Sequence, residues 1–345
     1  MKTEKKNLIG LSRQSLERYF IENGEKKYRA VQLMSWLYQK QATSFSQMTN
    51  FSKKSIEFLE QNACLDEPKI IKKQKSSDGT IKILLELADQ NLIETVFIPE
   101  NNRGTLCVSS QSGCILDCSF CATGFSGFAR NLTAAEIIGQ YRLMSELIQP
   151  AVISNVVFMG MGEPLLNYKA VLETLAVLLD DNGYNHSKRR VTVSTVGVVP
   201  AMDRLRSDID VSLAVSLHAA DDKLREKLVP LNKKYPLNDL IQACHRFVKN
   251  ETDRKKHIVI EYAMIKNVND DMMQAKKLVK LLSSLQVKVN LIPYNPFSGC
   301  DYQTSDENVI RKFADYLHNK GIRVMIRRTR GLDINASCGQ LARKF

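Results

Sequence analysis

The stretch GTLCVSSQSGCILDCSFC, residues 104–121, joins a run of strand-like composition to three closely spaced cysteines. Cys114, Cys118 and Cys121 follow one another at a C-x3-C-x2-C spacing, and no obvious fourth ligand lies nearby. Zinc sites usually offer paired C-x2-C units and four ligands in total, so a zinc site or a chance cluster is the weaker alternative. Three thiolates on a [4Fe–4S] cluster would leave one iron open for another molecule.

Strand-like runs recur along the rest of the chain, and each is followed by a longer helical pattern. Six repeats of strand then helix predict a parallel sheet with crossover helices, the arrangement of an α/β protein. Polar residues stand at the C-terminal end of nearly every run, and in barrels that end carries the chemistry. We therefore expect a partial (β/α)6 barrel rather than a doubly wound sheet. The runs cover residues 104–111, 153–160, 189–197, 211–219, 257–265 and 288–295.

The rest of the chain divides into segments around this barrel, which we expect to span residues 107–330. Residues 1–65 have helical periodicity and predict an N-terminal helical accessory domain. Alternating aromatic and basic residues there suggest RNA docking, although an ordinary amphipathic bundle explains them more simply. Residues 66–106 predict a β-rich linker with a hairpin turn at Asp78-Gly79. Residues 331–345 form a cysteine-bearing C-terminal tail.

Composition narrows the class of partner. The 345 residues are 44% hydrophobic and 25% charged, which is ordinary for a soluble globular protein. The formal net charge of +12 favours a polyanionic partner, with nucleic acid first and an anionic membrane surface second. The N-terminus lacks the apolar core of a secretory signal, and no apolar run approaches the ~20 residues of a membrane span. We therefore expect a cytoplasmic protein with no membrane partner.

The chain has eight cysteines, and a reducing compartment favours metal-binding or catalytic thiols over disulfides. Cys64, Cys244 and Cys300 stand apart from any motif, so we interpret them as packing or surface thiols.

A glycine-rich turn and several strand-end residues predict a cofactor pocket at the same end of the barrel. FMGMGEP, residues 158–164, places Gly162, where a backbone can approach a ligand closely, beside Glu163, whose carboxylate suits an ammonium group. A single strand-end polar group is more often simply hydrogen-bonded within the fold, but several in barrel register favour a pocket. They lie in TVSTVG, AVSLHA and LIPYNP and are Ser194, Ser216, Leu217, His218 and Asn295.

The segment CILDCSFC, with Phe120 before its third cysteine, resembles the cluster motif of the radical S-adenosylmethionine superfamily. FMGMGEP resembles the glycine-rich motif of the same superfamily. The resemblance implies that the open iron chelates the amino and carboxylate groups of S-adenosylmethionine. It also implies that Gly162 and Glu163 hold the methionyl amino group and that the strand-end residues contact the rest of the cofactor.

Two lone cysteines extend the resemblance over nearly the whole chain. CVSSQSGCILDCSFCATG, which begins at Cys107, combined with DINASCGQL, which contains Cys338, resembles the RlmN/Cfr family of RNA adenine methyltransferases. FMGMGEPLLNY and RRVTVSTVGVVPAM look like the RlmN branch of that family. Relatives of the Cfr branch typically have Ala after the GE pair, so Pro164 weighs against that branch and its C8 product.

This resemblance implies methylation of C2 of an adenine in 23S rRNA, and in tRNA as well, by a ping-pong reaction that uses two molecules of S-adenosylmethionine. Cys338 would carry the methyl group, Glu94 would accept the ring proton, and Cys107 would attack Cys338 to release the RNA and leave a disulfide. The resemblance also implies an electron donor of the flavodoxin or ferredoxin type.

Two rival functions stay open at this point. One is a radical enzyme with a small-molecule or protein substrate, and the other is a non-enzymatic zinc or RNA-binding module. Short basic runs could contact phosphates or could simply be solvated turns. They comprise Arg327, Arg328 and Arg330, then Lys72, Lys73 and Lys75, and residues 188–190.

Overall fold

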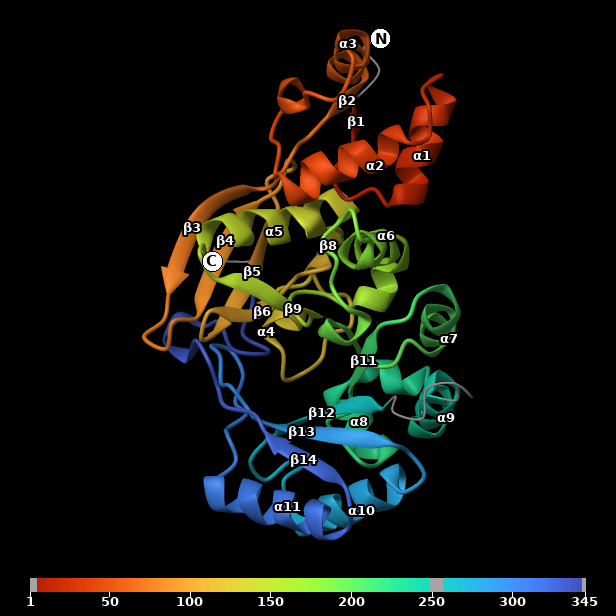
Figure 1. The fold of residues 1–345 in the computed structure, drawn as a ribbon. Helices are drawn as coiled ribbons and strands as arrows, with labels where there is room; N and C mark the ends of the chain where they lie inside the picture. Colours follow the sequence, from red (N-terminus) through yellow and green to blue (C-terminus); the bar gives the residue numbers. More distant parts are fainter. Residues whose placement is uncertain (1–4, 249–256, 343–345) are drawn as a thin grey trace.

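A curved, ten-stranded sheet organises the computed structural model, which describes residues 5–248 and 257–342 (Figure 1). The strands from β6 to β14 pair in parallel, and those from β3 to β6 pair antiparallel. In spatial order they are β3 (Lys69–Lys75), β4 (Ile81–Glu86), β5 (Leu92–Glu100), β6 (Arg103–Cys107), β9 (Val152–Phe158), β10 (Val191–Thr195), β11 (Ser212–Ser216), β12 (Ile258–Met264), β13 (Val287–Pro293) and β14 (Arg323–Ile326).

The parallel part of the sheet confirms the predicted partial barrel. Every strand-like run of the sequence forms a parallel strand, and a helix follows each one. A further parallel strand, β14, was not predicted, because its four residues are mostly exposed and lack a clear alternation. It forms through its pairing with β13, in which Val289 lies opposite Val324.

Helices cover the outer face of the barrel strands, where their apolar faces pack against the sheet (Figure 1). The first of them, α5, begins with a capping box in which Thr133 and Glu136 exchange hydrogen bonds, so the sequence itself fixes its start. No helix within the described ranges is long and apolar enough to cross a membrane. The helices are α5 (Ala134–Leu147), α6 (Tyr168–Leu179), α7 (Val199–Asp208), the short α8 (Asp222–Leu228), α9 (Leu237–Val248), α10 (Met272–Leu282) and α11 (Glu307–Asn319).

The segment expected to be a linker continues the barrel sheet. Strands β3 and β4 form the predicted hairpin around Asp78-Gly79, where Gly79 has a φ of +84°. Strand β5 pairs antiparallel with β6 and places Val96 opposite Cys107. Opposed residues of neighbouring strands share a face, and so do alternate residues of one strand, so Glu94 and Cys107 lie on the same face of the sheet.

The first residues form the predicted helices and dock on α5 and α6 (Figure 1). Arg13 binds Asp180 just after α6, with 2.8 Å between Nε and Oδ2. From α5, Arg142 binds the carboxylate of Glu67 and the carbonyl of Leu37. We call residues 5–65 the N-terminal module; it contains β1 (Lys6–Asn7), α1 (Arg13–Glu22), α2 (Arg29–Met34), a π-helical turn (Ser35–Gln39), α3 (Lys53–Asn62) and β2 (Ala63–Cys64).

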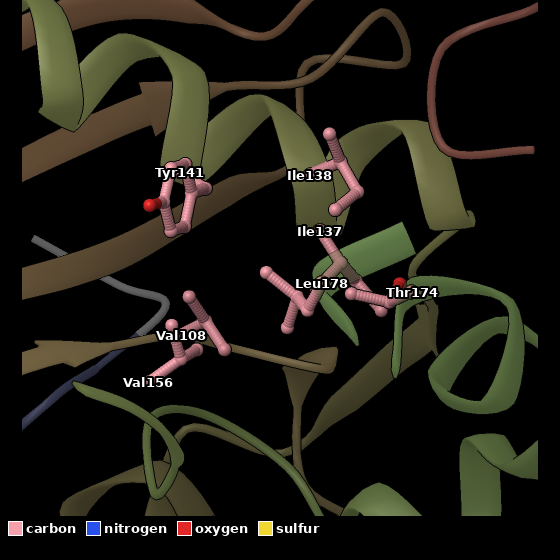
Figure 2. A pocket seen from close by; sticks show the side chains of 7 residues that line it. All are labelled: Val108, Ile137, Ile138, Tyr141, Val156, Thr174 and Leu178. Atoms are coloured by element: carbon pink, nitrogen blue, oxygen red, sulfur yellow. The ribbon is translucent and has the colours of Figure 1, made fainter. Parts of the chain in front are cut away.

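The main core lies between the sheet and its helices, and Figure 2 shows a narrow apolar gap within it. Its lining comes from the end of β6, from β9 and from the facing sides of α5 and α6. The gap therefore belongs to the packing between layers and lies on the opposite side of the sheet from Cys107. The lining side chains are Val108, Ile137, Ile138, Tyr141, Val156, Thr174 and Leu178.

Candidate functional site

The three clustered cysteines lie on a loop that is closed at its base by a small hairpin, β7 (Gln111–Gly113) and β8 (Phe128–Asn131). The amide of Cys114 donates to the carbonyl of Gly127 at an N–O distance of 3.1 Å, which closes the loop. Gly113 has a φ of +80°, and a Cβ there would lie 1.8 Å from the Gly127 oxygen, so only glycine fits. The short helix α4 (Ala122–Phe125) follows the third cysteine.

The thiols of this cysteine loop, residues 114–127, influence one another electrostatically. Burial raises the pKa of Cys114 to about 12, and the charge of Cys121 adds to the rise. Burial also raises the pKa of Cys118 well above its usual value, with Cys121 and Cys114 adding to it. Within the described ranges, no three His, Cys, Asp or Glu side chains are arranged to hold a single metal ion. A cubane binds each thiolate through a different iron, so its ligands need not converge in that way.

The cysteine loop is fixed to the barrel by contacts on both sides. The rings of Phe120 and His218 meet edge to face, with their centroids 4.4 Å apart. The amide of Ser119 donates to the carbonyl of Leu228 at the end of α8, at 3.2 Å. The thiol of Cys300, which we had interpreted only as a packing or surface group, donates to the carbonyl of Ser119 at 3.5 Å. No sequence spacing could have revealed that contact.

The glycine-rich turn after β9 packs directly on the strand that leads to the cysteines. Gly162 has a φ of +93°, and a Cβ there would lie 2.4 Å from the Cβ of Gln111. Glu163 is buried, and its carboxylate accepts from the amides of Leu165 and Val196 at 3.0 and 2.9 Å. Burial nevertheless raises its pKa to about 7. The carboxylate thus joins the turn to the end of β10, and its contact with the cofactor's ammonium stays a prediction.

The ends of β10 and β11 bring the expected polar residues together. The hydroxyl oxygens of Ser194 and Ser216 lie 3.5 Å apart, on neighbouring strands. The side chain of Leu217 is fully buried, so it contributes packing. His218 has a φ of +60°, and its Nδ1 accepts from the amide of Ala263 at 3.0 Å. Burial lowers the pKa of His218 to about 3, so the ring is neutral with its proton on Nε2.

Asn295, expected to contact a cofactor, binds the C-terminal tail in this structure. Its amide nitrogen donates to the carbonyl of Cys338 at 3.1 Å, and its oxygen accepts from the hydroxyl of Thr329 at 3.2 Å. Further along the tail, the carbonyl of Gly339 accepts from the amide of Ala122 at 2.7 Å. The tail therefore lies between the end of β13 and the cysteine loop.

Glu94 lies in the middle of β5 and is buried, rather than being a solvated strand-end carboxylate. Its Oε1 pairs with the Nζ of Lys82 at 2.8 Å, and both side chains are almost fully buried. Its Oε2 accepts from the amide of Ala342 in the tail at 3.1 Å. Burial raises its pKa, while Lys82 opposes the rise. A raised pKa makes the carboxylate a better proton acceptor than an exposed one.

Cys107 and Cys338 both lie at the barrel mouth, by which we mean the end of the barrel where the parallel strands end and where the cysteine loop lies. Cys107 is buried at the end of β6, and burial raises its pKa, with the charge of Cys338 adding to the rise. Cys338 is exposed, and desolvation by the surrounding protein raises its pKa. Every cysteine in the described ranges is a free thiol, so the disulfide implied by the resemblance is not formed in this structure.

The basic runs differ in their position relative to this mouth. Arg327 and Arg328 directly follow β14 and are exposed at the end of the strands where the cysteine loop lies, and the charge of Arg327 lowers the pKa of Cys338. Residues 188–190 precede β10, at the opposite end of the strands, and Lys188 pairs with Asp210 there. The lysines of β3 lie on the exposed edge strand. Basic residues of two of these runs thus act on residues of the mouth, since Arg327 lowers the pKa of Cys338 and Lys72 of β3 lowers that of Glu94.

Sequence reasoning missed one buried residue of the site, Arg225 in α8, which is 1% exposed. Its guanidinium donates to the carbonyls of Val196, Ser216 and Leu217, at the ends of β10 and β11. A single arginine in a helix that also carries exposed lysines gives no signal of such a role.

Known proteins match nearly the whole length of the chain. Residues 6–65 match the family described as the ribosomal RNA large subunit methyltransferase N-terminal domain, and residues 108–279 match the radical SAM superfamily. A protein of Alcanivorax borkumensis named dual-specificity RNA methyltransferase RlmN is 51% identical, with 98% of this chain and 90% of the relative covered. A protein of Ruthia magnifica with the same name is 50% identical, with 99% and 96% covered.

The fold also matches a solved structure. The crystal structure of a radical SAM methyltransferase from Sphaerobacter thermophilus superposes with a TM-score of 0.91. The two chains are 39% identical, and the match covers 98% of this chain and all of the other.

Proposed function

This chain belongs to the RlmN family of radical S-adenosylmethionine RNA methyltransferases, and from that premise we propose that it methylates C2 of an adenine in 23S rRNA and in tRNA. Its relatives are named dual-specificity enzymes, and the charge of +12 suits an RNA substrate. Pro164 after the GE pair supports C2 over C8. A digest of treated RNA should contain 2-methyladenosine, and mainly 8-methyladenosine would contradict the assignment.

The residues of the mouth fit the two cofactors of such an enzyme. The cysteine loop would hold a [4Fe–4S] cluster, and the strand ends with the turn at Gly162 would hold S-adenosylmethionine. Gly162 supports this, since any Cβ there would meet Gln111 and fill the turn. When bound, the cluster and two molecules of S-adenosylmethionine supply one methyl group and one 5′-deoxyadenosyl radical per turnover.

Cys338 carries the methyl group in this proposal. Adenine C2 is an amidine carbon without an attacking electron pair, so the methyl group first moves to a better nucleophile, the Cys338 sulfur. The 5′-deoxyadenosyl radical would take up one hydrogen atom from this S-methyl group, which leaves a carbon radical on the methyl carbon that adds to C2 of the adenine. The tail bonds of Asn295 and Ala122 hold the cysteine beside the cluster loop while this occurs.

Glu94 and Cys107 complete the reaction. Glu94 takes the proton from C2, and the ring gives up one electron, for which the oxidised cluster would be the acceptor. The ring thereby regains its aromaticity and stays linked to the protein as a protein–RNA thioether. The Cys107 thiolate then attacks the Cys338 sulfur and breaks its bond to the methylene carbon. The electron pair of that bond goes to the carbon, which takes up a proton and becomes the methyl group. The two cysteines end as a disulfide, which must be reduced before the next turnover.

The observation that carries this proposal is the meeting of Cys107, Glu94 and Cys338 beside the cysteine loop. Cys107 and Glu94 share one face of the sheet, and the tail that carries Cys338 bonds to Glu94 through Ala342. The charge of Cys338 also adds to the raised pKa of Cys107. These residues come from β5, β6 and the tail, so their meeting is not a consequence of sequence proximity.

Two cysteine variants test the assigned roles. Cys107→Ala should still accept the methyl group and form the radical, but should stall as a covalent protein–RNA adduct. Cys338→Ala should form no adduct, because it has no sulfur to methylate. Denaturing gels of proteins isolated with target RNA should show a nuclease-sensitive band for Cys107→Ala alone. Cys300→Ala is the matched control, since its thiol also contacts the cysteine loop. If Cys107→Ala and Cys338→Ala both stay free of RNA while wild type turns over, the roles are wrong.

The remaining assignments complete the proposal. We propose residues 1–65 as an accessory domain for RNA docking, residues 66–106 as its connection to the catalytic barrel of residues 107–330, and residues 331–345 as the methyl-carrying tail. A flavodoxin or ferredoxin type of protein would supply the electron, in the cytoplasm. RNA affinity that falls steeply with salt is the expected sign of phosphate contacts.

A further inference from the structure

Arg225 is a buried charge without a directly bonded carboxylate. Its side chain is 1% exposed, and its donors go to neutral oxygens: three backbone carbonyls and the Oδ1 of Asn232, at 2.8 Å. None of the ion pairs found within residues 5–248 and 257–342 includes it. Asn232 links Arg225 indirectly to a carboxylate, because its side-chain amide donates to the exposed Asp222. Burying a charge without a directly paired opposite charge costs several kcal/mol, and a negative group bound nearby would offset that cost.

The cysteine loop lies directly against the helix that carries this charge. The carbonyl of Leu228, one turn after Arg225 in α8, accepts from the amide of Ser119, the residue after Cys118. Cys118 and Leu228 pack in one buried apolar cluster, and Val196, whose carbonyl Arg225 binds, packs against that cluster. The side chains that pack around Cys118 on this side are therefore apolar and largely buried, and such low-dielectric surroundings strengthen the interaction between charges.

We propose that Arg225 is a positioning residue whose fixed positive charge stabilises the reduced form of the cluster held by Cys114, Cys118 and Cys121. This inference rests on the proposed function, since it assumes a cluster on those thiols. Reduction adds one negative charge to a group that already carries three thiolates, and a nearby buried cation favours the added electron. Burial lowers the pKa of Arg225 only to about 10, so it stays protonated at neutral pH.

The same side chain also ties β10 to β11, and the experiment must separate that structural role from the electrostatic one. Arg225→Lys keeps the charge and loses most of the hydrogen bonds. Arg225→Met loses both. Arg142→Met is the matched control, because Arg142 is also buried and also donates to backbone carbonyls, but it lies at the N-terminal module.

The measurement is a reductive titration of the anaerobically reconstituted full-length protein, followed by electron paramagnetic resonance, with iron and sulfide measured for each variant. At a fixed potential, Arg225→Met should lower the ratio of reduced to oxidised cluster about tenfold, which is 59 mV for a one-electron couple. Arg225→Lys should recover most of the loss, and Arg142→Met should match wild type. Asp222→Asn should raise the ratio, because it removes a negative charge and keeps an accepting oxygen for Asn232.

Each outcome decides one part of the argument. A fully loaded Arg225→Met cluster with the wild-type ratio overturns the inference, and so does an Arg225→Lys ratio as low as that of Arg225→Met. If Arg225→Met binds no cluster, the ratios of reduced to oxidised cluster in Arg225→Lys and Asp222→Asn test the electrostatic role instead. A wild-type ratio in Asp222→Asn together with a lowered ratio in Arg225→Lys would reject that role. A wild-type protein that binds no iron and sulfide contradicts the proposed function itself.

Discussion

Two regions of this molecule hold arginines in different ways. Where the N-terminal module meets α5 and α6, Arg142 binds Glu67 and backbone carbonyls, and Arg13 binds Asp180 and Asp181. Every one of these charges meets an opposite charge within the chain. At the barrel mouth, Arg225 is more deeply buried, yet its partners are neutral oxygens.

Glu163 at the mouth also bonds to neutral groups, the amides of Leu165 and Val196 and the side chain of Thr195, and burial raises its pKa to about 7. Glu94 differs, because it pairs with Lys82. At the module interface Arg142 and Arg13 thus pair with carboxylates of the chain, whereas at the mouth the hydrogen bonds of Arg225 and Glu163 go to neutral groups, and a bound group would supply their counter-charges. Functional sites commonly show such shifted and incompletely paired groups. Each prediction below tests whether the two regions respond separately.

The largest effect is expected at the cysteine loop. Cys118→Ala removes a thiolate that the cluster needs, so iron binding and methylation should fall below detection. Cys244→Ala is the matched control, since Cys244 is also buried but lies in α9 within the main core. It should keep full iron and lose only packing energy. Iron and sulfide content per folded protein measures both, and equal iron loss in the two variants would reject the assignment of the loop.

The next effect is expected at the module interface. Arg142→Met leaves Glu67 without its partner and should lower the free energy of unfolding by about 3 kcal/mol. Arg246→Met breaks an exposed pair with Asp203 and should cost less than about 1 kcal/mol. Urea denaturation measures both changes. Iron content per folded protein should stay at the wild-type value in Arg142→Met, and a large loss of iron would show that the two regions are coupled.

The sequence was more informative about the mouth than about the interface, for a physical reason. The cluster cysteines lie within eight residues, so their spacing alone predicted a shared site. Strand periodicity predicted that Ser194 and Ser216 lie at the ends of adjacent strands. Arg142 carried no signal because its partners lie far away in the chain, and Arg225 carried none because most of its partners are backbone carbonyls, which every residue has. The bond between Asn295 and Cys338 depends on where the tail folds back, which no local pattern determines. Strand β14 was missed for a similar reason, since its neighbour β13 defines it.

A smaller effect is expected in the pH dependence of stability, and it arises near the module interface rather than at the mouth. His186 lies near the module interface, where its Nε2 meets the hydroxyl of Tyr141 at 3.0 Å, and burial lowers its pKa to about 4. The unfolded chain binds this proton near pH 6.5, so between pH 6.5 and 4 the unfolded state holds more protons than the folded state. The stability from neutral His186 is complete above pH 6.5 and is lost as the pH falls.

His186→Gln keeps a hydrogen-bonding group and does not titrate. Acidification should therefore lower the unfolding free energy of wild type relative to that of this variant, by at most about 1.4 kcal/mol per pH unit. Denaturation in urea at pH 7 and pH 5 measures it. A difference that is the same at both values would mean that His186 titrates normally in the folded protein.

The smallest effect concerns the tail at the mouth. Asn295→Ala removes the bond from the Asn295 amide to the Cys338 carbonyl, and one such bond contributes about 1 kcal/mol net. The tail should then leave its docked position about fivefold more often, since 1.4 kcal/mol corresponds to a factor of ten. Asn62→Ala is the matched control, because it removes a similar bond to the carbonyl of Phe58 in the N-terminal module.

Alkylation of Cys338 by iodoacetamide in the cofactor-free protein, followed by mass spectrometry, reports how often the tail is undocked. Cys338 is exposed even when docked, so the wild-type rate is measurable, and the raised pKa of its thiol keeps that rate low. Undocking removes the surrounding protein that desolvates the thiol, which brings its pKa down and increases the reactive thiolate. Asn295→Ala should therefore be alkylated faster than wild type at Cys338, while Asn62→Ala should match wild type. Equal rates in all three proteins would mean that the remaining bonds, at Gly339 and Ala342, hold the tail without Asn295.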